Sequence, residues 1–286
     1  MGRISKRQAD RHYRAIDRAR NAIAPFDHET RKALLEDFHE AETVTRARDG
    51  VFFTPWEMAE HFNLYTHGGR VLDLCAGSGR LATAHWIHRY TDIRLDSAAE
   101  EMPEIVCVED NRDFVDFGQK VLPEATWIHG DVLDPAVWMR LGRFDYVIAN
   151  PPYGTSIPRS HNGPRYRGPH FELHVLDVAA TLSDRGLFLL PQGSTPFDPS
   201  GAGEAGSPYE VFRRQTGITL HSTNIDASAW RDEWHDASPA TEFVRFNFAD
   251  DQLQGTVTPE PFPLPRLALR TTPQPAKPLT LVGAIA

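Results

Sequence analysis

The chain contains only two cysteines, Cys75 and Cys107, and it lacks any hydrophobic run long enough to cross a membrane. Two cysteines cannot build a disulfide framework or a four-cysteine metal site, and the thirteen histidines show no metal-ligand spacing. A membrane-spanning helix needs about 18 consecutive apolar residues. The N-terminus is basic, but no apolar segment follows it as in a secretory signal. We therefore expect a cytoplasmic protein with no metal and no membrane partner.

Positive charge is also scarce over most of the chain. There are 30 Lys and Arg residues against 39 Asp and Glu residues, which gives a formal net charge of −9. Residues 1–20 nevertheless hold seven basic and two acidic side chains, so their net charge is +5 and that of the other 266 residues is −14. Because Lys and Arg displace counterions from phosphates, this basic segment suits a polyanionic partner. A solvated helix face explains the same charges equally well.

Composition and periodicity divide the 286 residues into three regions. Residues 1–49 carry the basic segment and apolar residues at helical spacing, which predicts a helical N-terminal extension. Residues 50–250 alternate between short apolar runs and helical stretches, and we expect them to form the main domain. Residues 251–286 form a proline-rich tail, with seven prolines between Thr256 and Pro278.

The N-terminal extension is predicted to hold two helices within residues 3–48. Pro25 separates them, and the second helix runs from about Asp27 to Arg48, before Gly50. The segment 52–55 then forms a short extended piece. Thr54 is predicted as the N-cap of a third helix, with Pro55 as its first residue and its end near residue 65.

The main domain alternates between strands and helices. Strands are predicted over 71–74, 105–108, 126–128, 146–149 and 186–190, and helices over 80–90 and 171–182. The last two strands, 218–225 and 242–248, are separated by only a loop's length, which favours an antiparallel hairpin at one sheet edge. Residues 92–104 and 191–208 predict surface loops. This order favours a Rossmann-like α/β fold, with a mostly parallel seven-stranded sheet covered on both faces.

The first motif of chemical interest is Asp73-x-x-x-Gly77-x-Gly79, at the end of the first strand. Its glycines let the backbone turn tightly and approach a ligand, and the following helix N-terminus favours a carboxylate or phosphate. The third glycine of a dinucleotide-binding motif is absent, because Ala82 stands in its place. A tight strand-to-helix turn needs glycine for structural reasons as well, so this motif alone is ambiguous.

Two acidic residues follow the next two strands. Glu109 comes directly after the second strand, where a carboxylate can accept both hydroxyl protons of a ribose. Asp131 follows the third strand and could accept a proton from an adenine amino group. An exposed glutamate and a turn aspartate are the structural alternatives for these two positions.

The sequence Asn150-Pro151-Pro152-Tyr153 follows the fourth strand and is the most specific signal in the chain. Two successive prolines remove two backbone donors and stiffen the turn. The Asn150 side-chain oxygen and the Pro151 carbonyl can then converge on one NH2 group. Tyr153 adds a flat ring on which a nucleobase can stack.

Together these motifs resemble the class I S-adenosylmethionine-dependent methyltransferases, in particular the gamma group of N6-adenine DNA methyltransferases. Phe52-Phe53-Thr54-Pro55 resembles the Phe-x-Thr-Pro segment of that group, which contacts the methionine end of the cofactor. The resemblance covers about residues 50–250, so it marks this region as the methyltransferase catalytic domain. It implies S-adenosyl-L-methionine as the cofactor and duplex or single-stranded DNA as the partner.

The resemblance also assigns roles to residues. It implies that Asn150 and Pro151 hold the target amino group at a corner completed by Pro152, while Tyr153 stacks on a flipped base. The cofactor-binding residues that it implies are Phe52, Phe53, Thr54, Asp73, Cys75, Ala76, Gly77, Gly79, Glu109, Asp110, Asp131, Val132 and Asn150.

The segment 159–168, after the Asn-Pro-Pro-Tyr motif, is glycine-rich, basic and aromatic. We interpret it as a loop that grips the substrate through Arg159, Arg165 and Arg167, although an ordinary solvent loop has a similar composition. Few residues are left for a separate target-recognition domain. The sequence therefore predicts a weak or very short sequence preference, which would suit a phage or mobile element that protects its own DNA.

Other functions remain open at this point. The same motif is compatible with methylation of cytosine N4, of guanine N2 in RNA, or of a glutamine amide in a protein. A silent nucleic-acid-binding module on the same scaffold is a further alternative. Methylation of a cytosine ring carbon needs a cysteine nucleophile, and neither cysteine is suitably placed for it. Trp230, Trp234 and Phe243 form either core beneath the last strands or a wall of the base pocket.

Overall fold

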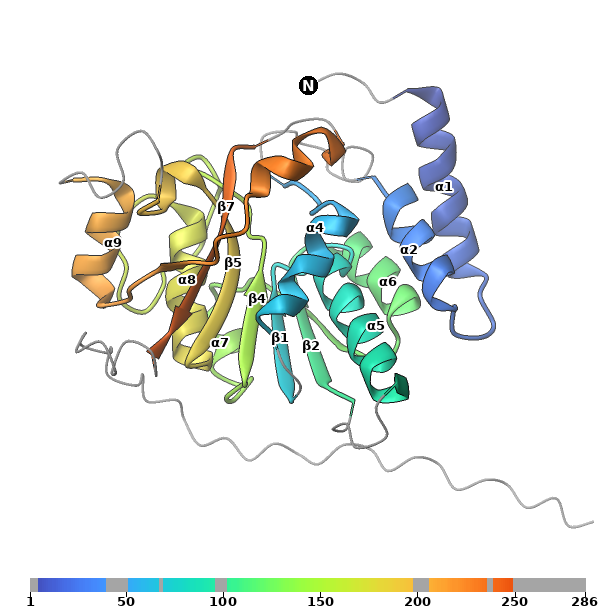
Figure 1. Cartoon of the computed structure of the whole chain (residues 1–286), viewed down its shortest axis with the longest axis horizontal. Helices are drawn as coiled ribbons and strands as arrows, with labels where there is room; N and C mark the ends of the chain where they lie inside the picture. Colours follow the sequence, from blue (N-terminus) through green and yellow to red (C-terminus); the bar gives the residue numbers. More distant parts are fainter. Residues whose placement is uncertain are drawn as a thin grey trace, which may run out of the picture.

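The computed structural model describes residues 5–39, 51–66, 69–95, 102–197, 206–235 and 239–248. Its centre is a seven-stranded sheet in the order β3-β2-β1-β4-β5-β7-β6 (Figure 1). The strands are β1 (Arg70–Leu74), β2 (Glu104–Glu109), β3 (Thr126–His129), β4 (Tyr146–Ala149), β5 (Arg185–Pro191), β6 (His221–Ser222) and β7 (Thr241–Asn247). The first five strands are parallel, and β7 runs antiparallel to both β5 and β6. The predicted Rossmann-like, mostly parallel sheet is therefore confirmed.

Helices cover both faces of the sheet, as predicted. One face packs against α4 (Trp56–His61), α5 (Arg80–Leu95) and α6 (Arg112–Val121). The other packs against α7 (Pro135–Trp138), α8 (Phe171–Leu182) and α9 (Pro208–Thr216). All twelve residues of α8 are buried. Because the carboxyl ends of parallel strands share one edge, the loops that carry the sequence motifs meet there.

Two helices precede the domain, α1 (Lys6–Arg20) and α2 (His28–Asp37). Ser5 and Asp27 cap their N-termini through side-chain oxygens. Arg31, whose side chain is buried, forms a two-pronged ion pair with Glu124 at 2.6 and 2.7 Å and so ties α2 to the loop before β3. The expectation that the second helix continues to residue 48 is wrong, since the chain turns extended at Phe38; residues 40–50 lie outside the described residues.

The prediction that Thr54 caps the third helix is also wrong. Pro55 is the N-cap of α4, and no side chain of the described residues caps this helix. The Thr54 hydroxyl instead accepts a hydrogen bond from Asn150, so a long-range partner has displaced the local one. The helix ends at His61 rather than near residue 65, and a short 3-10 helix, η1 (Phe62–Leu64), follows it.

Several boundaries in the main domain differ from prediction. α5 continues to Leu95, because residues 80–95 contain neither glycine nor proline to stop it; residues 96–101 are outside the described ranges. The predicted strand 218–225 is reduced to the two residues of β6, and the link to β7 contains a 3-10 helix, η3 (Ala227–Glu233). In the predicted loop 191–208, Pro191 ends β5, residues 192–194 form a 3-10 turn, η2, and Pro208 opens α9; residues 198–205 are not described.

The proline-rich tail also lies outside the described residues. Within those that are described, no helix combines the length and the apolar character that a membrane span requires.

Candidate functional site

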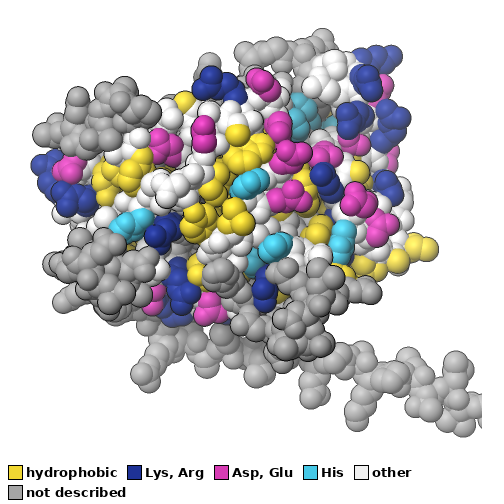
Figure 2. Space-filling model, in the orientation of Figure 1, with side chains coloured by type: hydrophobic (Ala, Val, Ile, Leu, Met, Phe, Trp, Pro, Cys, Tyr) yellow, Lys and Arg dark blue, Asp and Glu magenta, His cyan; other side chains and the backbone are white. Residues whose placement is uncertain are grey.

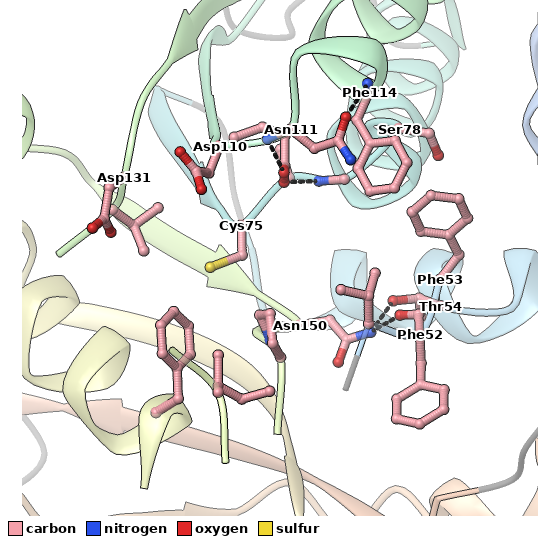
Figure 3. A pocket seen from close by; sticks show the side chains of 18 of the residues that line it. Phe52, Phe53, Thr54, Cys75, Ser78, Asp110, Asn111, Phe114, Asp131 and Asn150 are labelled. Atoms are coloured by element: carbon pink, nitrogen blue, oxygen red, sulfur yellow. Dashed lines mark hydrogen bonds between the residues drawn. The ribbon is translucent and has the colours of Figure 1, made fainter. Parts of the chain in front are cut away.

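A cavity of about 780 Å³ opens at the carboxyl ends of β1 to β4 (Figure 3). Figure 3 shows Asp110 and Asp131 on one side of it, Phe53 and Phe114 on the other, and Cys75 between them. The structure thus brings together residues from four separate motifs. The predicted site residues that line the cavity are Phe52, Phe53, Thr54, Cys75, Ala76, Gly77, Glu109, Asp110, Asp131, Val132, Asn150, Pro152 and Arg159.

The glycine turn forms the floor of the cavity. Gly77 has a φ of 57°, and a Cβ atom there would lie 3.1 Å from the Phe53 ring, so both the backbone conformation and the close approach of that ring favour glycine. Gly79 has a φ of 90° and faces Trp127 rather than the cavity, so it serves the packing of α5 on the sheet. Burial and the nearby Glu109 carboxylate raise the pKa of the Cys75 thiol well above its usual value, and a neutral thiol results.

Glu109 is held in place by backbone groups. One of its carboxylate oxygens accepts from the Gly77 N–H and the other from the Asn111 N–H, both at 2.8 Å. Burial raises the pKa of this carboxyl group, while the two hydrogen bonds oppose that rise. Each oxygen keeps a second lone pair, so the carboxylate can still accept hydroxyl protons from a ligand in the cavity.

Asp73 lies beneath the turn rather than in the cavity wall. It is fully buried, and one of its oxygens accepts from the Ala82 N–H at 3.1 Å, which fixes the start of α5. Burial raises the pKa of Asp73 well above its usual value. Its other oxygen and the hydroxyl of Ser78, which does line the cavity, have no hydrogen-bond partner among the described residues. These two buried polar atoms leave hydrogen-bonding capacity close to the turn.

The acids beyond β2 and β3 stand on the opposite wall. Asp131 accepts from the Leu133 N–H at 2.8 Å and from the Ser160 hydroxyl at 2.7 Å. The Asp110 side chain is exposed, and its backbone carbonyl bonds to the ring of His129. Through Ser160, the loop that follows the Asn-Pro-Pro-Tyr corner reaches across to the third strand.

The corner itself has a defined amide orientation. The Asn150 Nδ2 group donates to the carbonyl of Phe52 and to the hydroxyl oxygen of Thr54, both at 2.9 Å. Because the Phe52 carbonyl can only accept, the nitrogen must face it and Oδ1 must face the other way, and the Thr54 hydroxyl then accepts as well. The Tyr153 hydroxyl donates to this Oδ1. Pro152 lines the cavity, whereas Pro151 is buried and, like Tyr153, stands outside its lining.

The Phe-x-Thr-Pro segment is anchored by a buried arginine that the sequence motifs do not single out. Arg80 donates to the Thr54 carbonyl at 2.9 Å and to the Leu35 carbonyl at 2.6 Å, and it lines the cavity. It therefore joins α2, the extended segment and α5. Its place directly after Gly79 was the only sequence signal available.

The loop after the corner is tied to α8 by three fully buried polar side chains. Glu172 accepts from the Gly154 N–H, His174 from the Gly163 N–H, and Asp177 from the backbone N–H groups of residues 165 and 166. None of these three side chains was predicted to be buried, because polar residues on a helix indicate an exposed face until the tertiary structure buries them.

The three arginines of this loop have different surroundings. Arg159 lines the cavity, and its guanidinium also donates to the Asn162 side chain and to the carbonyls of Gly168 and Pro169. Arg165 pairs with the buried Asp177 at 2.8 Å, and Arg167 donates to backbone carbonyls of its own loop, at Gly163 among others. The guanidinium groups of Arg165 and Arg167 therefore help to hold the loop together, and their role as substrate contacts stays a prediction.

The basic N-terminal segment forms an exposed surface of α1. Figure 2 shows Lys and Arg side chains gathered at the upper right, where Figure 1 places this helix. Arg7, Arg11, Arg14 and Arg18 are exposed, and Arg11 pairs with Asp37 of α2. Arg3 lies outside the described residues.

The chain matches no family model and no curated protein. Among solved structures it is similar to the methyltransferase subunit of a type I restriction-modification system from Streptococcus thermophilus, with a TM-score of 0.52 and 16% identity, over 76% of this chain and 49% of that one. It is also similar to a Listeria monocytogenes protein described among the class I S-adenosylmethionine-dependent methyltransferases, with a TM-score of 0.50 and 13% identity, over 85% and 72%. This chain spans about half the length of the first protein. Identities this low establish the fold alone, which is that of the class I methyltransferases.

Proposed function

We propose that this protein transfers a methyl group from S-adenosyl-L-methionine to the exocyclic N6 amine of adenine in DNA. The observation that carries the proposal is the fixed Asn150 amide. Its nitrogen is held by Phe52 and Thr54, so its oxygen is offered as an acceptor beside a cavity floored by the glycine turn. The Asn-Pro-Pro-Tyr motif and its resemblance to the gamma group support adenine as the target.

The cavity fits the proposed cofactor. Glu109 has lone pairs for the ribose hydroxyls, and Asp131 faces the same space from the third strand. The Ser78 hydroxyl, which has no hydrogen-bond partner among the described residues, suits the polar methionine end. When bound, S-adenosylmethionine supplies an electrophilic methyl group on a sulfonium.

The residues at the corner would act by positioning the amine. An exocyclic amine is a poor nucleophile, because its lone pair is delocalised into the ring. The Asn150 oxygen and the Pro151 carbonyl would accept its two hydrogens and favour the pyramidal form, whose lone pair can be aligned with the methyl group. No strong base is required, since the amine becomes acidic once it is methylated. The incoming amine would take the place of the Tyr153 hydroxyl on the Asn150 oxygen.

A base inside a duplex cannot reach this corner, so the target must be flipped out or lie in a single strand. Arg159 and the arginines of α1 are candidates for sequence-independent phosphate contacts, which supports a weak or short sequence preference.

The test is a methyl-transfer assay with methyl-labelled cofactor and separate pools of duplex DNA, single-stranded DNA and RNA. Digestion to nucleosides and mass spectrometry then identify the polymer and the methylated base. We expect N6-methyladenine in at least one DNA pool. Label in RNA alone, in cytosine or in the protein itself would refute the proposal.

A further inference from the structure

The rings of Phe52 and Phe53 point in opposite directions. Successive side chains of an extended segment alternate between its two sides. Figure 3 shows Phe53 turned toward Phe114, while Phe52 points away from both on the far side of Thr54. The Phe53 ring lies 5.0 Å from the Phe114 ring and against the glycine turn. The resemblance predicts both phenylalanines as cofactor contacts, but their rings lie on opposite sides of the extended segment.

The Phe52 ring lies next to the Asn-Pro-Pro-Tyr corner. Its centroid is 6.1 Å from that of Tyr153, and the two ring planes meet at only 30°. Phe52 is half-buried and also lines the cavity. Stacked bases are about 3.4 Å apart, so a base held between two rings needs about 6.8 Å. Because 6.1 Å separates the centroids of two tilted rings, the rings must move apart and become parallel to admit a base.

We propose that Phe52 and Tyr153 form an aromatic clamp that holds the target base between their rings. This inference rests on the proposed function, because it concerns the same site. It assigns Phe52 to the substrate and leaves Phe53 to the cofactor side. The ligand class is a flat heteroaromatic ring with an amino group on its edge.

The surroundings of the clamp orient both of its rings before a base enters. Trp234 is buried and meets the Phe52 ring edge-on, at 6.2 Å and 89°. The Phe52 carbonyl accepts from Asn150 Nδ2, and the Tyr153 hydroxyl donates to Asn150 Oδ1. Both clamp residues are therefore bonded to the amide that is proposed to accept the target amine. A ring inserted between them would turn its edge toward Asn150.

The clamp also provides selectivity. A glutamine side chain carries an amide but no ring, so it would gain nothing from the two aromatic faces. Stacking of a base on an aromatic side chain corresponds to a change in affinity of about 5- to 150-fold. The clamp thus favours a nucleobase over a protein amide at a corner that could accept either one chemically.

Fluorescence of 2-aminopurine tests the clamp without any turnover. A thymidine oligonucleotide with one 2-aminopurine is titrated with protein saturated with S-adenosylhomocysteine. We expect wild type to quench the probe by stacking. Phe52→Leu should bind the oligonucleotide about 5- to 150-fold more weakly with little quenching, and Phe52→Tyr should restore both. Cofactor affinity should change much less than oligonucleotide affinity in both variants, which a purely structural role would not predict.

Phe53→Leu is the matched control, because the neighbouring ring lies on the cofactor side. The Phe53→Leu variant should bind the cofactor more weakly but should still quench most of the 2-aminopurine fluorescence. If Phe52→Leu proves poorly folded by circular dichroism, Phe52→Met removes the ring while keeping an unbranched apolar side chain. Absence of quenching in wild type, equal oligonucleotide binding by wild type and Phe52→Leu, or loss of cofactor affinity alone would overturn the clamp. Quenching without methylation of adenine would instead refute the proposed function and leave the clamp standing.

Discussion

Replacing Thr54 by valine removes one of the two acceptors that orient the Asn150 amide. The bond from Asn150 Nδ2 to the Thr54 hydroxyl is 2.9 Å long, and Thr54 is only 3% exposed. Valine has nearly the same shape as threonine, so the substitution deletes the acceptor with little change in packing. The second bond, to the Phe52 carbonyl, remains.

The size of the effect follows from burial. A buried N–H group left without a partner costs about 1–3 kcal/mol, since water does not replace the lost acceptor. If the whole of this cost is added to the activation free energy of methyl transfer, the rate drops about 5- to 150-fold, because about 1.4 kcal/mol corresponds to a factor of ten. Thr54→Ser keeps the hydroxyl and should retain most of the wild-type rate.

The assay is single-turnover methyl transfer at saturating cofactor and DNA, so that weaker binding does not contribute. Cofactor affinity is measured in parallel, because Thr54 also lines the cavity. A valine variant as fast as wild type, or a serine variant slower than the valine variant, would refute the idea that this hydroxyl positions Asn150.

Further predictions concern the supports of the site. Glu172 is buried, and although burial raises the pKa of its carboxyl group, hydrogen bonds including that from Gly154 lower it below the ordinary value. The stability that Glu172 contributes is therefore present above the ordinary glutamate pKa and is lost as the pH falls through the lowered pKa of the folded state. A Glu172→Gln variant should unfold at a lower temperature at neutral pH, and its stability should depend less on acid pH. Burial raises the pKa of Glu109, so cofactor affinity measured by calorimetry should begin to fall at a pH above the usual glutamate range, and Glu109→Gln should abolish this dependence. Arg31→Ala leaves Glu124 unpaired and should lower stability to urea, with cofactor affinity unchanged; a change in affinity at unchanged stability would contradict a purely structural ion pair.

Sequence patterns predicted the sheet well, because each strand is a short apolar run bounded by turn residues. The hydrophobic period also located α8 correctly, at residues 171–182. α9 was missed, although Ser207 as N-cap, Pro208 at the first turn and Gly217 in the left-handed conformation are all local signals of a helix.

The candidate site was predicted by residue type but not by contact. Thr54 and Asn150 are 96 positions apart, so no local rule could show that the threonine hydroxyl bonds to Asn150 instead of capping a helix. The same limit applies to Arg165, whose charge suggested a substrate contact and whose pairing with Asp177 is visible only in the structure. Motifs at strand ends could be predicted to meet at one edge, whereas the direction of each side chain depends on the tertiary packing.

Three thymidine oligonucleotides that each contain a single adenine, cytosine or guanine test the central claim most directly, because thymine has no exocyclic amine. Each is incubated with S-adenosylmethionine and the protein, and the product is weighed and sequenced by mass spectrometry. We predict one added methyl group, on N6 of the single adenine, and none with Asn150→Ala, which removes the amide oxygen offered beside the cavity. Transfer to the cytosine or guanine oligonucleotide, or an Asn150→Ala variant that methylates the adenine as fast as wild type, would contradict the account.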